Sequence, residues 1–347
     1  MNQPLNEFEQ HSSDWRKSLR MNSRRTYFVI GSFLFIYAAL GFLIDLYLLS
    51  AKYPHRPLHD YASALLSFSV TPTATLVLLA VAAIALFVTF KFHDKLMLLG
   101  TNSREITPET AANLQEKQLY NIIEELRVAA GLKYTPKVYI IDADYMNAFA
   151  SGYSEKSSLM AITSGLLNKL DRSETQAVMA HEMSHIRHMD IKLTLMASVL
   201  ANIMVMTLDF FFYSMIFGRR DDEKGDNRLF FIIILLRYLM PIVTVLLTLY
   251  LSRTREYMAD AGCVELMRDN TPLARALLKI QQDTEQNAEQ YNSDYAQTPH
   301  EDVRRSAYIY DPAQAGISSV KTLSSLFSTH PEIESRLEAI GFRKRQS

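Results

Sequence analysis

The sequence predicts a membrane protein with four hydrophobic α-helices and a cytoplasmic α+β domain. The main observation is that apolar residues gather into four long blocks, over 27–49, 73–90, 193–217 and 229–251. A helix needs about 20 apolar residues to cross the hydrocarbon core of a bilayer. The polar stretches between the blocks alternate short helical and strand-like patterns, which is typical of an α+β domain.

Composition excludes several classes of protein. The 347 residues are 48% hydrophobic and 21% charged, so the chain has enough apolar material to fold and is not a disordered protein. The formal net charge of −1 gives no reason to expect nucleic acid as a partner. The single cysteine, Cys263, excludes an internal disulfide framework and a cysteine-based metal cluster.

The four blocks differ in how many charges they contain. The first contains Asp45, the second contains no charge, the third contains Asp209, and the fourth contains Arg237 together with Pro241. We interpret the first block as a retained span, because it is longer than the apolar region of a cleaved signal peptide. For the third and fourth blocks, a buried or re-entrant helical pair remains the alternative to a spanning hairpin.

Basic residues predict the orientation in the membrane. Five basic side chains precede the first block, whereas the loop after it carries Lys52 and Arg56. The excess of Lys and Arg in cytoplasmic loops then places the N-terminus inside. Three basic residues between 218 and 227 oppose this rule at the tip of the second hairpin. The predicted parts are a polar segment over 1–26, two transmembrane helices joined by an outside loop over 27–90, a cytoplasmic part over 91–190, a transmembrane hairpin over 191–251 and a second cytoplasmic part over 252–347.

The two charges inside the hairpin suggest a specific contact. Asp209 lies nine residues before Gly218, and Arg237 lies nine residues after Arg228. At the helical rise both lie roughly 13 Å from the tip. Because an unpaired charge in lipid is costly, we predict an intramembrane pair between Asp209 and Arg237.

The polar stretches predict the elements of the cytoplasmic domain. Apolar spacing and start signals predict helices, and short β-branched runs predict strands. The expected helices cover 105–135, 174–190, 273–282 and 332–340, and the expected strands cover 138–141, 148–151 and 159–163. The polar stretch 283–303 is expected to be a loop.

A metal-binding pattern lies in the 174–190 helix, where the sequence HEMSH begins at His181. His181 and His185 are one turn apart on one face, so both imidazoles can reach the same ion. Glu182 between them can act on a metal-bound water. The alternative is an ordinary helix with two histidines at a water–lipid boundary.

A catalytic zinc site needs a third protein ligand and an open fourth position. His188 lies on the same face, but it is about 10 Å along the helix axis from His181, too far to share one ion. Glu256 is the better candidate, because a hairpin of the third and fourth blocks returns it beside the histidine helix. Asp260, one turn later, can accept the second N–H of a ligand histidine and fix its tautomer.

Five motifs together resemble a known family. They are HExxH at 181–185, REYxAD at 255–260, NAFA at 147–150, AITxGLL at 161–167 and STHP at 328–331 followed by Arg336. Over about residues 25–342 the chain resembles the HtpX-type membrane zinc metallopeptidases, which are relatives of the CAAX prenyl endopeptidases. The resemblance implies a gluzincin-like metallopeptidase domain that binds one Zn²⁺ per chain through His181, His185 and Glu256, with Glu182 as the catalytic residue. The N-terminal 26 residues and the stretch 283–303 make the chain longer than typical members.

The resemblance also suggests how a peptide is bound and cleaved. It makes His330 a candidate donor to the charge that develops on the scissile carbonyl, although a surface histidine in a turn is the alternative. Arg336 either supports His330 or a carboxylate or forms a surface salt bridge. Asn147, Ala148 and Phe149 begin a strand that is expected to align substrate as an exposed edge, with an ordinary core strand as the alternative.

The expected function is that of a membrane-bound zinc endopeptidase. Its substrates would be cytoplasmic segments of membrane proteins or unfolded proteins, in quality control and stress response at a bacterial inner membrane. Two other functions stay open: a site-2-type intramembrane protease, for which Asp209 is the only downstream aspartate inside a block, and a non-enzymatic membrane scaffold that retains the motif.

Overall fold

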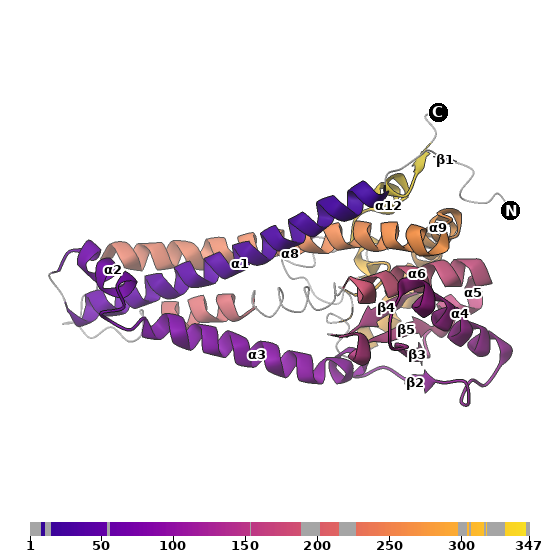
Figure 1. Cartoon of the computed structure of the whole chain (residues 1–347), viewed down its shortest axis with the longest axis horizontal. Helices are drawn as coiled ribbons and strands as arrows, with labels where there is room; N and C mark the ends of the chain where they lie inside the picture. The colour runs from indigo at the N-terminus through magenta and orange to yellow at the C-terminus, as the bar shows by residue number, and fades with distance from the viewer. Residues whose placement is uncertain are drawn as a thin grey trace. The chain divides into compact units, whose positions relative to one another are not determined.

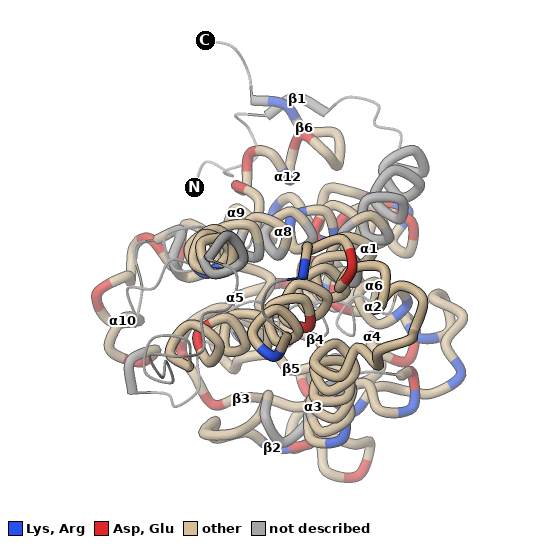
Figure 2. Tube along the Cα trace, turned by 90° about the vertical axis from the view of Figure 1, so that its left-hand side faces the viewer, with Lys and Arg blue, Asp and Glu red and all other residues tan. Residues whose placement is uncertain are grey.

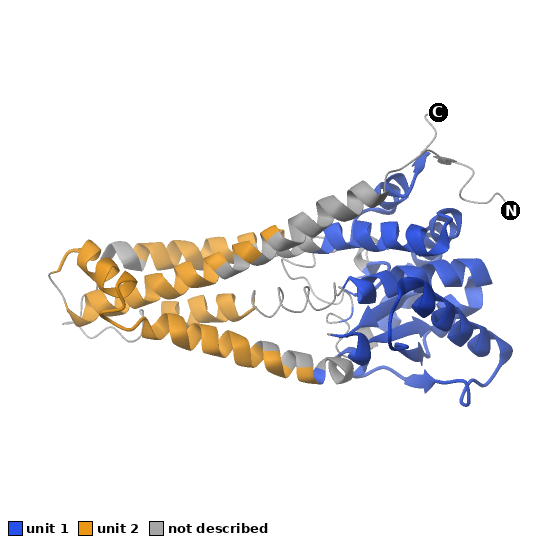
Figure 3. Cartoon of the chain, in the orientation of Figure 1, with its two compact units in different colours: residues 1–26, 92–194, 249–347 blue, residues 27–91, 195–248 orange. Residues whose placement is uncertain are grey.

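The computed structural model describes most of the chain. It covers residues 8–10, 15–53, 56–152, 154–188, 202–214, 227–297, 304, 307–315, 317 and 330–344. The chain divides into two compact units (Figure 3). Unit 1 comprises residues 1–26, 92–194 and 249–347, and unit 2 comprises residues 27–91 and 195–248.

Unit 1 contains a four-stranded sheet (Figure 1). Its strand order is β2-β3-β5-β4, with β3 and β5 parallel and the other two pairs antiparallel. The strands are β2 Ser103–Ile106, β3 Lys137–Ile141, β4 Ala148–Ser151 and β5 Leu159–Thr163. Every residue of β4 and β5 is buried, which explains why their sequences read as continuous apolar runs rather than alternating ones.

Helices surround this sheet. Helix α6 packs against α4, α9, β4 and β5, and it therefore lies at the core of unit 1. The helices of unit 1 are α4 Leu114–Ala130, α5 Ser164–Lys169, α6 Arg172–Arg187, α9 Thr271–Gln286, α10 Ala288–Gln297 and α12 Ile333–Ala339, with short 3₁₀ turns at η2 Glu155–Ser157 and η3 Pro312–Ala315. A separate two-stranded sheet pairs β1 Phe8–Gln10 with β6 Phe342–Lys344.

Two of the expected elements differ from those observed. The helix expected over 105–135 begins only at Leu114, with Asn113 as its N-cap, because residues 103–106 pair with β3 as a strand instead. The expected loop over 283–303 contains the end of α9 and the whole of α10, whose tyrosines pack into the hydrophobic core. The sequence of this helix looks polar because its buried residues are tyrosines, whose aromatic rings pack in the core although they carry hydroxyl groups.

Unit 2 consists mainly of long apolar helices. They are α1 Trp15–Lys52, α2 Leu58–Leu66, α3 Thr73–Leu98, a helical stretch over 202–214 and α8 Asn227–Met267; α1, α3 and α8 also extend into unit 1. Most of α3 is tan in Figure 2, where charged residues are coloured. Many of its large apolar side chains are exposed, namely Leu76, Val77, Leu79, Val81, Ile84, Phe87 and Val88.

Only part of the expected membrane topology has a counterpart in the described helices. One described segment, Phe35–Lys52, is both long and apolar enough to cross a bilayer. Thr73–Ala85 and Phe231–Val243 are shorter apolar helical segments. Much of the third block, and the tip of the predicted hairpin up to residue 226, lie outside the described residues.

The contact between α1 and α3 depends on two residues of α1. Asp45 accepts hydrogen bonds from the backbone N–H groups of Ala74 and Thr75, at 2.7 and 3.0 Å, and from the Thr75 hydroxyl. It therefore caps the first turn of α3, where backbone donors lack helical partners. Gly41 permits this close approach, because a Cβ atom there would lie 2.9 Å from the Thr75 Cα.

The charges predicted to pair in the hairpin lie together in unit 2. The Arg237 Nε donates a hydrogen bond to Asp209 Oδ1 at 2.7 Å. The guanidinium also lies over the Phe212 ring, 4.1 Å from its centroid. Both contacts stabilise a cation among apolar helices.

This pair leads to a charge-exchange prediction. Asp209→Arg alone and Arg237→Asp alone each leave like charges opposed, so each variant should accumulate in membranes to less than about half the wild-type level. The double exchange restores opposite charges and should recover most of that loss, as measured by quantitative immunoblotting of membrane fractions. A double variant that accumulates no better than the single variants would show that the pairing does not matter for stability.

Candidate metal centre

Helix α6 supplies the first two candidate ligands. A capping box fixes its start: the Glu174 N–H donates to the Asp171 side chain at 2.9 Å, and the Asp171 N–H donates back to Glu174 at 3.0 Å. His181 and His185 follow one turn apart and are 0% and 6% exposed. Their rings therefore converge inside unit 1, not at its surface.

Helix α8 brings the third candidate ligand to the same place. Glu256 and Asp260 lie one turn apart and are both buried. Two residues later, Gly262 lies against α6, where an added Cβ would be 2.4 Å from the Ser184 hydroxyl oxygen. This close helix contact requires glycine, and it brings the two carboxylates beside the histidines.

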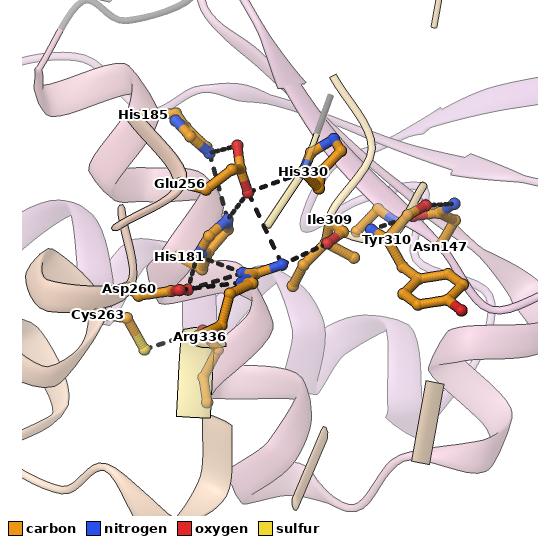
Figure 4. Close-up of polar contacts among 12 residues, drawn as sticks. Asn147, His181, His185, Glu256, Asp260, Cys263, Ile309, Tyr310, His330 and Arg336 are labelled. Atoms are coloured by element: carbon orange, nitrogen blue, oxygen red, sulfur yellow. Dashed lines mark hydrogen bonds and ion pairs between the residues drawn. The ribbon is translucent and has the colours of Figure 1, made fainter. Parts of the chain in front are cut away.

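The three candidate ligands fit a zinc ion by chemistry and by spacing (Figure 4). The His181 and His185 Nε2 atoms are 3.2 Å apart, and each lies 3.5 Å from a Glu256 carboxylate oxygen. Zinc with ligand bonds of 2.0–2.1 Å in a tetrahedral arrangement separates its ligand atoms by about 3.3 Å. Two imidazoles and one carboxylate also form a known donor set of catalytic zinc sites.

Glu182 differs from every other carboxylate in this cluster. Both of its oxygens are buried, and neither has a hydrogen-bond partner among the residues that the structure describes. Burial raises the pKa of Glu182 to about 7. A buried carboxylate without partners is costly, so its presence beside converging ligands indicates a group kept available for proton transfer.

Asp260 and Arg336 form an ion pair directly behind His181. The His181 Nδ1 lies 2.9 Å from Asp260 Oδ1. Arg336 donates from Nε and Nη2 to the two Asp260 oxygens, at 2.9 and 2.7 Å. Burial alone would raise the pKa of Asp260, but Arg336 and His181 hold it below its ordinary value. Because the Nδ1 atom of His181 contacts Asp260, its Nε2 atom is the one available to bind a metal ion.

His181 itself binds a proton tightly when no metal is bound. Burial alone would lower its pKa, but hydrogen bonds to Asp260 and Glu256 raise it to about 9. For Glu256, burial acts to raise the pKa, yet His330 and His181 hold it well below its ordinary value. The carboxylate is therefore ionised at neutral pH, as a metal ligand requires.

The structure places His330 at this centre. The His330 Nδ1 lies 3.0 Å from a Glu256 oxygen, and the side chain is buried. Cys263 directs its thiol to the Ala177 carbonyl at 3.2 Å, so its role is packing. Asp209, the alternative acidic ligand, is paired with Arg237 in unit 2.

The stretch 147–151, expected to be an exposed edge, is buried over its whole length. Asn147, Ala148 and Phe149 are at most 1% exposed. The Ile309 N–H donates to the Ala148 carbonyl at 2.9 Å, and Phe149 pairs with Tyr308 as an antiparallel bridge. A distant segment of the chain therefore covers the side of β4 that the sequence left free.

Sequence reasoning missed the role of residues 308–310 and left the partner of Arg336 open. Among its alternatives, contact with a carboxylate is the one observed, and Arg336 is 0% exposed. The signal available in the sequence was the position of Arg336 in a short terminal helix. If that helix packs into the interior, its guanidinium is buried and requires an ionic partner. No local pattern marked the Ile309 carbonyl, which also accepts from Arg336 at 2.7 Å.

Comparison with known proteins assigns the chain to a family. The profile of Peptidase family M48 matches residues 113–344. The "Protease HtpX homolog" of Helicobacter pylori is 37% identical over 333 residues, covering 96% of this chain and 99% of that protein. The proteins of the same name from Dictyoglomus thermophilum and Streptococcus uberis are 36% and 32% identical, covering 72% and 93% of this chain and 76% and 98% of their own lengths.

Solved structures were also compared with the chain. The crystal structure of S. mikatae Ste24p matches with a TM-score of 0.46 and 19% identity, covering 96% of this chain and 68% of that one. The family match covers strands β3, β4 and β5 and the helices that carry the candidate ligands. The chain therefore belongs to peptidase family M48, a family of zinc metalloproteases.

Proposed function

We propose that the chain is a membrane-bound zinc endopeptidase that cleaves cytoplasmic segments of membrane proteins. The observation that carries this proposal is the convergence of His181, His185 and Glu256 beside the unpartnered carboxylate of Glu182. Their ligand atoms all lie within 4.8 Å of one another in the interior of unit 1. Two imidazoles and a carboxylate that converge in this way next to Glu182 suit a hydrolytic metal site.

The proposed mechanism assigns a role to each residue of the cluster. A zinc ion held by His181, His185 and Glu256 would supply an activated water and polarise the scissile carbonyl. Glu182 accepts a proton from that water and delivers it to the leaving amine. In the metal-free chain burial raises the pKa of Glu182 to about 7, so this carboxyl can exchange a proton near neutral pH. His330 donates a hydrogen bond to the charge that develops on the substrate oxygen.

Unit 2 supports the proposal of membrane attachment. Phe35–Lys52 is long enough to span a bilayer, and α3 exposes large apolar side chains along a stretch without charges. Extensive exposed apolar surface of this kind needs a nonaqueous environment. We propose two spans over 27–90 and a hairpin over 191–251, with residues 1–26, 91–190 and 252–347 in the cytoplasm, as the basic residues before the first span favour.

The substrate class follows from this placement. Residue 190 lies three residues before the third apolar block, so the zinc helix would lie within a few turns of the membrane surface. Cytoplasmic segments of damaged or misassembled membrane proteins, and unfolded chains near the bilayer, are the proposed substrates. The corresponding role is quality control and stress response at a bacterial inner membrane.

Glu256 favours this function over a site-2-type intramembrane protease. That alternative needs an aspartate ligand from inside a span, and Asp209 is hydrogen bonded to Arg237 instead. Glu256 supplies the carboxylate from a segment of α8 that belongs to unit 1. A non-enzymatic scaffold that kept the motif has no use for the unpartnered Glu182, and the following variant tests it directly.

Replacing Glu182 with glutamine should separate metal binding from catalysis. Gln keeps the size of the side chain but cannot accept a proton, so proteolysis of an unfolded test protein should fall at least about a hundredfold. Zinc content, measured by mass spectrometry of the detergent-purified protein, should stay at one ion per chain. Glu289→Gln, at an exposed position of α10, is the matched control and should cleave at the wild-type rate. Metal-free, inert wild-type protein would support the scaffold function instead.

Zinc affinity should depend on pH because a proton competes for His181. The raised pKa means that the metal-free protein holds this proton below about pH 9, and zinc must displace it. We expect the apparent affinity to rise about tenfold per pH unit from pH 7 to 9 and then to level off. Calorimetric titration in buffers of different ionisation enthalpy counts the released proton. An affinity that is independent of pH over this range would contradict the protonation state inferred for His181.

A further inference from the structure

Residues 308–310 lie along the outer edge of β4 and are joined to it by one isolated bridge and one backbone hydrogen bond. The Ile309 N–H donates to the Ala148 carbonyl at 2.9 Å, and Tyr308 faces Phe149 in an antiparallel bridge. Tyr308, Ile309 and Tyr310 are 1%, 1% and 3% exposed. This segment is thus part of the interior of unit 1 and lies where a paired substrate strand was expected.

The Asn147 side chain fastens this segment. Its Nδ2 donates to the Tyr310 carbonyl at 3.0 Å and to the Tyr295 hydroxyl at 3.3 Å. Its Oδ1 accepts from the N–H of Ala148 at 3.1 Å and of Tyr310 at 3.4 Å. An amide offers two donors and two acceptor positions, so the protein itself uses all four. Asn147 therefore has no hydrogen bond left to offer a substrate.

The fastened segment in turn orients Arg336 (Figure 4). The Ile309 carbonyl accepts a hydrogen bond from Arg336 Nη1 at 2.7 Å, while the other side of the guanidinium binds both oxygens of Asp260. Asp260 lies 2.9 Å from the Nδ1 of His181. A continuous line of buried contacts thus leads from Asn147 to a candidate zinc ligand.

Helix α10 supports the same segment from the other side. The Tyr295 ring stacks on Tyr145 at 4.3 Å between centroids, and Tyr308 meets both rings edge-on at 6.3 and 6.4 Å. Tyr291 joins this cluster at 6.3 Å from Tyr145. Helix α10, which lies in a stretch expected to be a loop, thus packs against the segment that contacts Arg336.

We propose that Asn147 is a positioning residue for the zinc site, and that it does not bind substrate. Its amide holds Tyr310 at both the N–H and the carbonyl, which fixes the Ile309 carbonyl where Arg336 needs an acceptor. Arg336 then keeps Asp260 aligned with His181. Mutating the hydrogen-bond partners that orient a ligand histidine typically lowers metal affinity by 10- to 100-fold. This inference rests on the zinc site proposed above.

Zinc release measures this role without relying on catalysis. The zinc-loaded, detergent-purified full chain is mixed with excess chelator, and the rate of metal loss is followed. Asn147→Asp keeps the shape of the side chain but places an acceptor against the Tyr310 carbonyl, so release should be about tenfold faster than in the wild type. Asn147→Ala removes the same hydrogen bonds without adding charge, and it serves if the aspartate variant does not fold. At saturating zinc the KM for a peptide should stay unchanged, whereas a substrate-binding asparagine would raise KM and leave release unaltered.

A double-mutant cycle distinguishes positioning from general loss of stability. Arg336→Lys keeps the positive charge opposite Asp260. Because lysine lacks the planar guanidinium, it cannot hydrogen bond to Asp260 and to the Ile309 carbonyl at the same time. In that background Asn147→Asp should accelerate release by less than about twofold, because both changes break the same line of contacts. Ile123→Val in the core of α4 is the control that lowers the melting temperature without changing release.

The outcomes separate this inference from the proposed function. Wild-type protein that binds no zinc overturns both. Wild type that retains zinc, with Asn147 variants that release it at the wild-type rate, overturns the positioning role alone. Multiplicative effects of Asn147→Asp and Arg336→Lys also overturn it, since independent sites add in free energy. A KM increase without faster release would return Asn147 to substrate binding.

Discussion

The buried ion cluster of Asp260, Arg336 and His181 is the interaction on which the candidate site depends. It joins α8, α12 and α6, which come from distant parts of the sequence. Removing one partner from such a buried pair leaves an uncompensated charge and typically costs about 3–5 kcal/mol. The same contacts fix the tautomer of His181 and direct its Nε2 toward Glu256. Stability and metal chemistry therefore share one set of side chains.

The core of the site could be predicted because it is encoded locally. The spacing of His181 and His185 on one helix determines that their rings converge, and Glu182 follows from its place between them. Glu256 required one assumption of topology, a chain that returns beside the zinc helix. Arg336 and Ile309 could not be placed in this way, since their contacts join segments that no periodic pattern relates. Only the folded chain reveals them.

The errors in the predicted fold have the same origin. Residues 103–106 pair with β3, and this long-range pairing takes precedence over the helical spacing read across 105–135. The stretch 283–303 seemed too polar to pack, yet Tyr291 and Tyr295 place ring surface in the core while their hydroxyls remain hydrogen bonded. The edge of β4 was expected to be exposed, but it is covered at Ala148. The unpaired N–H and C=O groups of an edge strand can bind another segment of the chain.

Zinc K-edge X-ray absorption spectroscopy of the detergent-purified protein tests the central claim most directly. A site built from His181, His185 and Glu256 predicts two imidazole nitrogens at about 2.0–2.1 Å and carboxylate oxygen at about 2.0–2.2 Å, with no sulfur ligand. Substituting Glu256 with alanine should remove the oxygen contribution from the spectrum or the metal itself. Substituting an exposed carboxylate such as Glu289 should leave the zinc spectrum unchanged. A wild-type spectrum with a single imidazole, or one that the Glu256 substitution leaves unchanged, would contradict the account.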